Sequence, residues 1–190
     1  MGLFNSNDLR QLARSKRPLH ETSTEYIRKS FSQFNQYKNY DVFLSHSYKD
    51  ADVILGLCLF IESLGYSVYL DWIEDPQLDR TKVSPKTAKL LKQRMKSSKC
   101  LIFATSENSP DSKWMPWELG YFDALRNGKV GILPISERID TQDDFKGQEY
   151  LGLYYYIVRT VNYMYVHNSS NQFVDFDRWL QENNSLPERA

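Results

Sequence analysis

The stretch KCLIFATS, residues 99–106, is a run of apolar residues that predicts a buried β-strand. A continuous apolar run of this length is typical of a parallel strand that is covered on both faces. Further apolar segments of this kind lie on either side of it: DVFL (41–44), SVYLDW (67–72) and KVGILPI (129–135), of which the last is expected to stop at Pro134. Residues that favour β-strands also fill YYYIVRTVNYMYV (154–166).

Segments with helical spacing separate these strands. Apolar residues recur at helical intervals over 53–64 and 88–95, and a helix that begins with SKWMPWELG is expected to run to about Asn127. A closing helix is expected over 174–183. Because strands and helices alternate, the sequence predicts an α/β fold with a flavodoxin-like, doubly wound, five-stranded parallel sheet.

The first 37 residues follow a different pattern. They are polar and mixed in charge, with helical spacing in SNDLRQLA (6–13) and HETSTEYIRKSFSQF (20–34). Ser6 or Asn7 is the expected cap of the first of these helices. We therefore predict two parts, an N-terminal helical extension over 1–37 and one domain over 38–190.

Composition excludes several classes of protein. Hydrophobic residues make up 41% of the chain, which is enough for a packed core. The formal net charge is zero, so no overall basic field is available to hold nucleic acid. No apolar stretch reaches the ~20 residues of a membrane span. We therefore expect a cytoplasmic protein that binds neither nucleic acid nor membrane.

Metal and disulfide chemistry are not expected. Cys58 and Cys100 each lie inside an apolar run, which favours buried thiols over a disulfide or a metal pair. The three histidines, His20, His46 and His167, are too far apart for a zinc spacing.

In a doubly wound sheet, ligands bind outside the carboxyl ends of the strands. Motifs for several ligands are missing there, since the chain has no GxGxxG, no GxxxxGK[ST] and no GxSxG. The strand over 99–106 ends in Thr105-Ser106, whereas a phosphoacceptor receiver needs an aspartate. The candidate substrate-binding residues at the strand exits are Ser45, His46, Asp71, Trp72 and Ser106. His46, Asp71 and Trp72 each also have an ordinary structural interpretation.

Glu118 is the most unusual candidate, because SKWMPWELG (112–120) surrounds it with bulky apolar residues. Helical angles place Glu118 on the apolar face, with Trp114 one turn before it on the same side. A carboxylate near a helix start often only satisfies free backbone N–H groups. The other interpretation is that it awaits the hydroxyls or the developing positive charge of a ligand, since burying it unpaired costs several kcal/mol.

Four segments together resemble the TIR domain over about residues 38–183. YDVFLSHSYKD resembles the first TIR box, and LGYSVYLDW resembles the second strand. SENSPDSKWMPWEL resembles the segment in which a tryptophan precedes the catalytic glutamate by one helical turn, and KVGILPI resembles the fourth strand. The resemblance assigns Glu118 as the catalytic residue and Trp114 as the tryptophan one turn before it. The loop IEDPQLDRTKVSP lacks the RDxxPG signature of receptor adaptors, so the chain is more similar to bacterial TIR proteins, and most to the TIR subunit of the Thoeris anti-phage system.

This resemblance implies an enzyme that cleaves the nicotinamide–ribose bond of NAD+ and forms a cyclic ADP-ribose-type signal. It implies NAD+ as substrate, no resident cofactor or metal, a separate effector that the signal activates, a phage-derived trigger, and self-association. The loop over 73–85 is the expected lid. Two alternatives stay open: a TIR scaffold that signals only by self-association, and a regulator that binds NAD+ without cleaving it.

Overall fold

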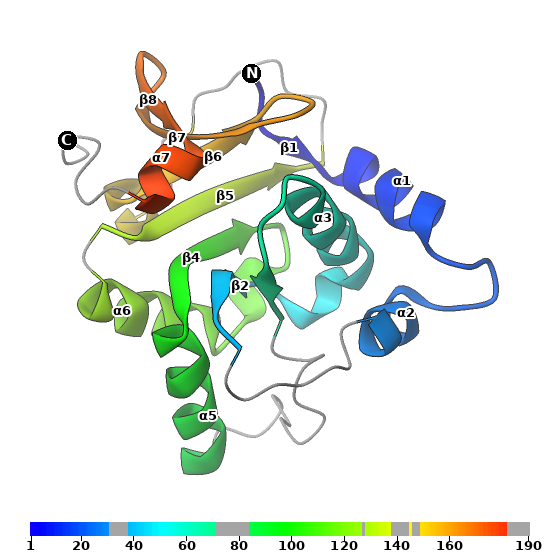
Figure 1. The fold of residues 1–190 in the computed structure, drawn as a ribbon. Helices are drawn as coiled ribbons and strands as arrows, with labels where there is room; N and C mark the ends of the chain where they lie inside the picture. The colour runs from blue at the N-terminus through cyan, green and yellow to red at the C-terminus, as the bar shows by residue number, and fades with distance from the viewer. Residues whose placement is uncertain (31–37, 71–83, 127, 138–144, 146–148, 182–190) are drawn as a thin grey trace.

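The computed structural model describes residues 1–30, 38–70, 84–126, 128–137, 145 and 149–181. Its centre is one sheet with the strand order β3-β2-β4-β5-β6-β7-β8, and β1 pairs with β5 off this path (Figure 1). The strands are β1 (Phe4–Asn5), β2 (Tyr40–Ser45), β3 (Val68–Tyr69), β4 (Ser98–Thr105), β5 (Val130–Ser136), β6 (Tyr155–Arg159), β7 (Met164–Ser169) and β8 (Gln172–Asp175).

The predicted doubly wound parallel sheet is confirmed, and the sheet is larger than predicted. Strands β3, β2, β4, β5 and β6 are neighbours that pair in parallel, in the flavodoxin-like order. Strands β7 and β8 extend the sheet in antiparallel pairing. The segment 154–166 therefore contains most of a hairpin, which turns where the Thr160 N–H donates to the Tyr163 carbonyl at 2.9 Å.

Helices connect and cover the strands. The α-helices are α1 (Ser6–Lys16), α2 (Ser23–Ser30), α3 (Ala51–Ser63), α5 (Pro85–Lys96), α6 (Met115–Leu125) and α7 (Phe176–Gln181). Short 3₁₀ helices are η1 (Tyr48–Asp50), η2 (Ser109–Asp111) and η3 (Glu149–Leu153).

Strand β4 shows how the two layers form. Cys100 and Ile102 point into the core cluster that includes α3, α1 and α7, whereas Leu101 and Phe103 point into the cluster that includes α5 and α6. Successive residues of a strand face opposite sides, so a strand that is apolar throughout must be covered on both. Figure 1 shows α1 and α3 on one side of the sheet and α5 and α6 on the other.

The N-terminal segment packs into the first of these clusters. Phe4 has no exposed surface and meets the Phe60 ring edge-on at a centroid distance of 5.5 Å. Strand β1 pairs with the end of β5, with Phe4 opposite Ile135, and α1 lies along α3. The cap of α1 is Asn5, whose Oδ1 accepts the N–H of Asn7 at 2.9 Å. The predicted caps Ser6 and Asn7 were wrong because β1 ends at Asn5, so the helix starts earlier.

Strand β5 does not stop at Pro134, which corrects a second prediction. Pro134 is the last residue of β5 that pairs with β4, opposite Thr105. The strand continues because Ile135 and Ser136 pair with β1 instead. Strand β1, which the sequence did not predict, therefore lengthens β5 beyond its proline.

Candidate active site

Helix α6 presents the SKWMPWELG segment at the carboxyl edge of the sheet. It begins at Met115, where the N–H donates to Ser112 Oγ at 3.3 Å, and ends at Leu125. Pro116 lies in the first turn, where a missing N–H costs nothing. The helix is therefore shorter than predicted, since it begins inside SKWMPWELG at Met115 and ends at Leu125, before Asn127, and Trp114 is its N-cap residue.

Glu118 points inward, as predicted. Its side chain has no exposed surface, like that of Met115, and Leu119 is nearly as buried. The Glu118 N–H donates to the Trp114 carbonyl at 2.8 Å, which places these residues one helical turn apart. Trp114 is only 6% exposed. The carboxylate thus lies in an apolar, aromatic surrounding, where a polar partner is required.

Ser45 supplies a partner. It is the last residue of β2, it is fully buried, and its Oγ donates to Glu118 Oε2 at 2.6 Å. A hydroxyl–carboxylate bond of this length belongs to the strong class. The bond joins residues 73 positions apart in sequence. Because Ser45 ends β2, this contact fixes Glu118 at the carboxyl edge beside the switch in strand order.

His46 follows Ser45 and is also fully buried. Its Nδ1 lies 2.8 Å from the carbonyl oxygen of Leu44. A carbonyl oxygen only accepts, so Nδ1 carries the proton in this arrangement. His46 therefore anchors the end of β2 in this structure.

Ser106 is engaged by a residue that the sequence did not single out. Its Oγ donates to Asp50 Oδ2 at 2.5 Å. Asp50 ends η1 and is 8% exposed, so this bond lies mostly out of water. The remaining strand-exit candidates, Asp71 and Trp72, lie outside the described residues. Their predicted contact with substrate stays a prediction, as do the binding roles of Ser45, His46, Ser106 and Trp114.

An aromatic run continues outward from Trp114 along α6. Trp117 meets Trp114 edge-on at 5.4 Å and stacks on Tyr121 at 5.8 Å. Lys92 of α5 lies over the Tyr121 ring at 5.3 Å. The sequence signal for this run was the spacing of three and four residues from Trp114 to Tyr121, which puts neighbours on one helix flank.

Within the part of the chain that the structure describes, no helix is long and apolar enough to cross a membrane. Among the same residues, no group of three or more His, Cys, Asp or Glu side chains gathers as a metal site. Cys58 and Cys100 are buried free thiols, as predicted.

Comparison with known proteins identifies the class of protein to which this fold and the site at the carboxyl edge of the sheet belong. Residues 42–182 match the TIR domain family, and the chain belongs to that family. It is also similar to a Bacillus cereus (strain MSX-D12) protein named "Probable 3' cyclic ADP-D-ribose synthase ThsB'". The two are 47% identical over 197 residues, which cover 96% of this chain and 100% of the relative.

A second relative, from Cytobacillus dafuensis, is named "Putative cyclic ADP-D-ribose synthase TIR2". It is 44% identical over 85 residues, which cover 44% of this chain and 22% of that protein. The similarity to the Bacillus cereus protein carries more weight here, because it covers nearly all of this chain and the whole of the relative.

Proposed function

We propose that this chain is a bacterial antiviral TIR enzyme that cleaves the nicotinamide–ribose bond of NAD+ and forms a cyclic ADP-ribose-type signal. The observation that carries the proposal is the buried Glu118 carboxylate, held by Ser45 at 2.6 Å and placed one turn after Trp114. The similarity over 96% of this chain to the Bacillus cereus protein named "Probable 3' cyclic ADP-D-ribose synthase ThsB'" supports the same activity.

The chemistry needs an anion beside the ribose. When the bond from C1′ of the ribose to the nicotinamide nitrogen breaks, nicotinamide leaves with the electron pair and C1′ becomes oxocarbenium-like. A carboxylate at that point stabilises the positive charge and binds the ribose hydroxyls, as in glycoside hydrolysis. Glu118 takes this role in our proposal, Ser45 orients its carboxylate, and Trp114 forms an apolar wall.

The cyclic product requires that water be kept out. Another nucleophile of the same molecule, on the adenine or a ribose, then attacks C1′ and loses a proton as the ring closes. The Bacillus cereus relative is named for a 3′ cyclic product. We propose a cyclic ADP-ribose of that type for this chain.

The burial of Glu118 bears on regulation. Its carboxylate has no exposed surface, so NAD+ contacts it only after the atoms that cover it move. We therefore propose a resting state with low turnover that a phage-derived trigger activates in the cytoplasm. Self-association completes the active form, and the nucleotide signal activates a separate effector protein.

Mass spectrometry of nucleotides from phage-challenged and unchallenged cells tests this function. Cells that carry the wild type should lose NAD+ and gain nicotinamide and a cyclic ADP-ribose after challenge. The Glu118→Gln variant should show neither change while it keeps the wild-type circular dichroism spectrum, because an amide accepts the Ser45 bond but carries no charge. Glu107→Gln is the matched control, since Glu107 is exposed and the same replacement there should leave turnover intact.

Three outcomes separate the alternatives. Full turnover by Glu118→Gln contradicts the proposed role of the carboxylate. Protection of cells without any NAD+ consumption identifies a scaffold that signals by self-association. Tight NAD+ binding by the purified chain, with no cleavage in challenged cells, identifies a nucleotide-binding regulator.

A further inference from the structure

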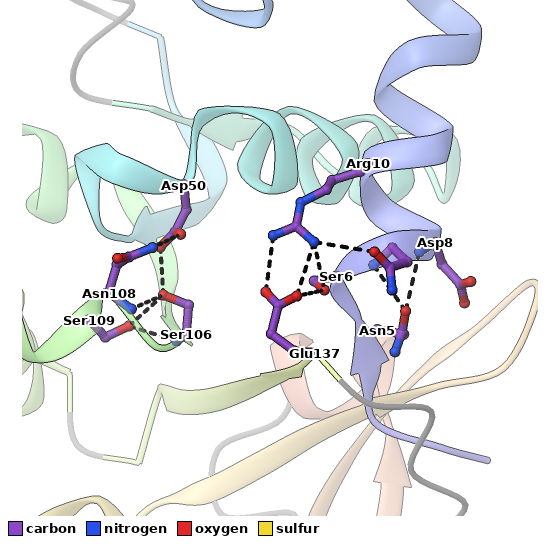
Figure 2. Close-up of polar contacts among 10 residues, drawn as sticks. Asn5, Ser6, Asp8, Arg10, Asp50, Ser106, Asn108, Ser109 and Glu137 are labelled. Atoms are coloured by element: carbon purple, nitrogen blue, oxygen red, sulfur yellow. Dashed lines mark hydrogen bonds and ion pairs between the residues drawn. The ribbon is translucent and has the colours of Figure 1, made fainter.

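A second polar cluster lies at the same edge of the sheet and is centred on Asp50, as Figure 2 shows. Each carboxylate oxygen of Asp50 accepts a hydrogen bond. Oδ2 accepts from Ser106 Oγ at 2.5 Å, and Oδ1 accepts from Asn108 Nδ2 at 2.6 Å. Asp50 is 8% exposed. Short, sheltered bonds to a carboxylate are the strong kind, so this residue fixes both of its donors.

These donors belong to the loop between β4 and α6. Within that loop the Asn108 N–H donates to Ser106 Oγ at 3.1 Å, and the Ser106 N–H donates to Ser109 Oγ at 2.7 Å. The Ser112 N–H then donates to the Ser109 carbonyl at 3.1 Å. Ser112 in turn accepts the N–H of Met115, the first residue of α6. A continuous series of hydrogen bonds therefore runs from Asp50 to the start of the helix that carries Glu118.

The other end of the series leads back to Ser45. Asp50 lies five residues after the end of β2, in the segment that joins β2 to α3. The Ser45–Glu118 bond and the Asp50 cluster thus join the same two segments of chain, one through the catalytic carboxylate and one through the loop before it. Without the Asp50 cluster, the loop before α6 would lose its buried hydrogen bonds to the segment after β2, and the Ser45–Glu118 bond would be the remaining buried one of the two described here.

A third link between these segments, the ion pair of Lys49 with Asp111, is too exposed to hold the loop before α6 in place. Lys49 Nζ pairs with Asp111 at 2.6 Å, but the two side chains are 59% and 62% exposed. Exposed ion pairs of long side chains contribute little, because water and side-chain entropy oppose them. This pair spans the same gap as Asp50 and so provides a matched control.

We propose that Asp50 is a positioning residue, which holds the loop 106–112 so that α6 presents Glu118 to Ser45 and to the substrate. The inference rests on the proposed function and adds to it. Asp50 does not contact the reacting atoms in this proposal. Its loss lets the start of α6 shift, and small misplacements of a catalytic group lower turnover by about 100-fold.

The test compares purified full-length variants by initial rates of nicotinamide release and by hydrogen exchange of the peptides that cover 104–118. In Asp50→Asn, the new amide N–H₂ faces one of the two groups that donate to Asp50, Ser106 Oγ or Asn108 Nδ2, so one of the two hydrogen bonds is lost. We expect kcat to fall about 10–100-fold and KM to stay within about twofold. Exchange in 104–118 should become faster, while the melting midpoint of the whole chain changes little. Lys49→Ala should match the wild type in all of these measurements.

A reciprocal exchange of groups distinguishes positioning from general damage. In the double variant Asp50→Asn/Asn108→Asp, the amide at position 50 donates to the carboxylate at 108 and accepts from Ser106. This variant should recover most of the lost kcat and the slow exchange. Normal kcat in Asp50→Asn, or a double variant no better than the single ones, overturns the inference. A wild type that consumes no NAD+ in challenged cells defeats the proposed function instead, and the exchange data then report only whether Asp50 orders the loop.

Discussion

At the scale of single residues, the pairing of Glu118 with Ser45 is the most informative contact. A buried carboxylate in an aromatic surrounding is costly unless hydrogen bonds compensate it, and Ser45 provides such a bond at 2.6 Å. This geometry gives the strand-exit serine an orienting role in our proposal, beside the substrate-binding role that the sequence suggested. An oriented carboxylate is already in place when charge develops on the ribose.

Removing the Ser45 hydroxyl should therefore slow turnover. Loss of a hydrogen bond to a charged group costs about 1.5–3 kcal/mol, and that amount corresponds to about 10–100-fold in rate. Ser45→Ala should lower kcat by this factor in steady-state assays of nicotinamide release. Ser47→Ala is the control, because Ser47 is also buried but its hydroxyl accepts the Lys49 N–H, at 3.4 Å, in place of a bond to Glu118. Equal kcat values for the two variants would count against an orienting role for Ser45.

The raised pKa values of the two cysteines predict how their thiols react with disulfide reagents. Burial raises the pKa of the Cys58 thiol well above its ordinary value, and the nearby Glu62 carboxylate adds to this shift. Burial also raises the pKa of Cys100. Only the thiolate reacts with disulfide reagents, so neither cysteine should react at pH 8 in the folded protein. Both should react in guanidinium, and Ser15→Cys, which places a thiol on an exposed helix position, should react at once without denaturant.

At the scale of elements, Gly56 sets the distance between α1 and α3. A Cβ built on Gly56 would lie 2.0 Å from the backbone carbonyl oxygen of Leu9. Backbone cannot move aside as a flexible side chain can, so any larger residue must push α1 away. The close contact of the two helices in Figure 1 therefore depends on this glycine.

We expect Gly56→Ala to destabilise the chain by about 1–3 kcal/mol, as overpacked cores do. Gly120→Ala is the opposite case, since Gly120 is an exposed helical position where an added Cβ would meet no atom within 4 Å among the described residues. That replacement should stabilise the chain by about 0.5–1 kcal/mol, because alanine loses less conformational entropy in a helix. Urea unfolding midpoints measure both, and destabilisation by both alike would contradict the packing argument.

An ion pair connects α1 to the residue after β5. Arg10 Nη2 lies 3.0 Å from Glu137 Oε1, and Ser6 Oγ donates to the same carboxylate at 2.7 Å (Figure 2). The hydrogen bond from Arg10, followed by that from Ser6, holds the pKa of Glu137 below its ordinary value. The side chains are 32% and 41% exposed, so solvent screening keeps the stabilisation small.

The stabilisation by this pair should depend on pH. A carboxylate whose pKa is lowered by folding stabilises the protein above its unfolded pKa, about 4.3, and this contribution disappears as the pH falls through the lower folded pKa. A double-mutant cycle of Arg10→Ala and Glu137→Gln should give a coupling of about 0.5–1 kcal/mol at pH 7. The coupling should shrink steadily below about pH 4. A coupling that is constant down to pH 3 would rule out the carboxylate's charge as its source.

At the scale of the whole molecule, the N-terminal segment packs as part of the domain core. Phe4 has no exposed surface, and the Arg159 guanidinium lies over its ring at 5.6 Å. Arg159 also pairs with Asp8 at 2.5 Å, and its backbone bonds to Gly2 in both directions. Residues at the start of the chain thus contact α3, β5 and β6 together.

We expect Phe4→Ala to destabilise the entire chain by about 3–5 kcal/mol, in a single unfolding transition. Leu19→Ala is the control in the same segment, because Leu19 is fully exposed and its removal should change the unfolding midpoint very little. Urea unfolding followed by tryptophan fluorescence measures both. An unchanged midpoint in Phe4→Ala would show that the segment is an appendage that unfolds independently of the domain.

The sequence by itself determined the parallel core of the fold and the direction of Glu118. Both follow from local periodicity, since apolar runs such as 99–106 mark strands covered on two faces and helical angles place Glu118 on the inward side. The tertiary structure alone decided the contacts between distant residues: Ser45 with Glu118, Asp50 with Ser106, and β1 with β5. The spacing of apolar residues along the sequence does not predict these pairs. Each pair depends on the order of the strands in the sheet and on the distance between two segments after the chain has folded.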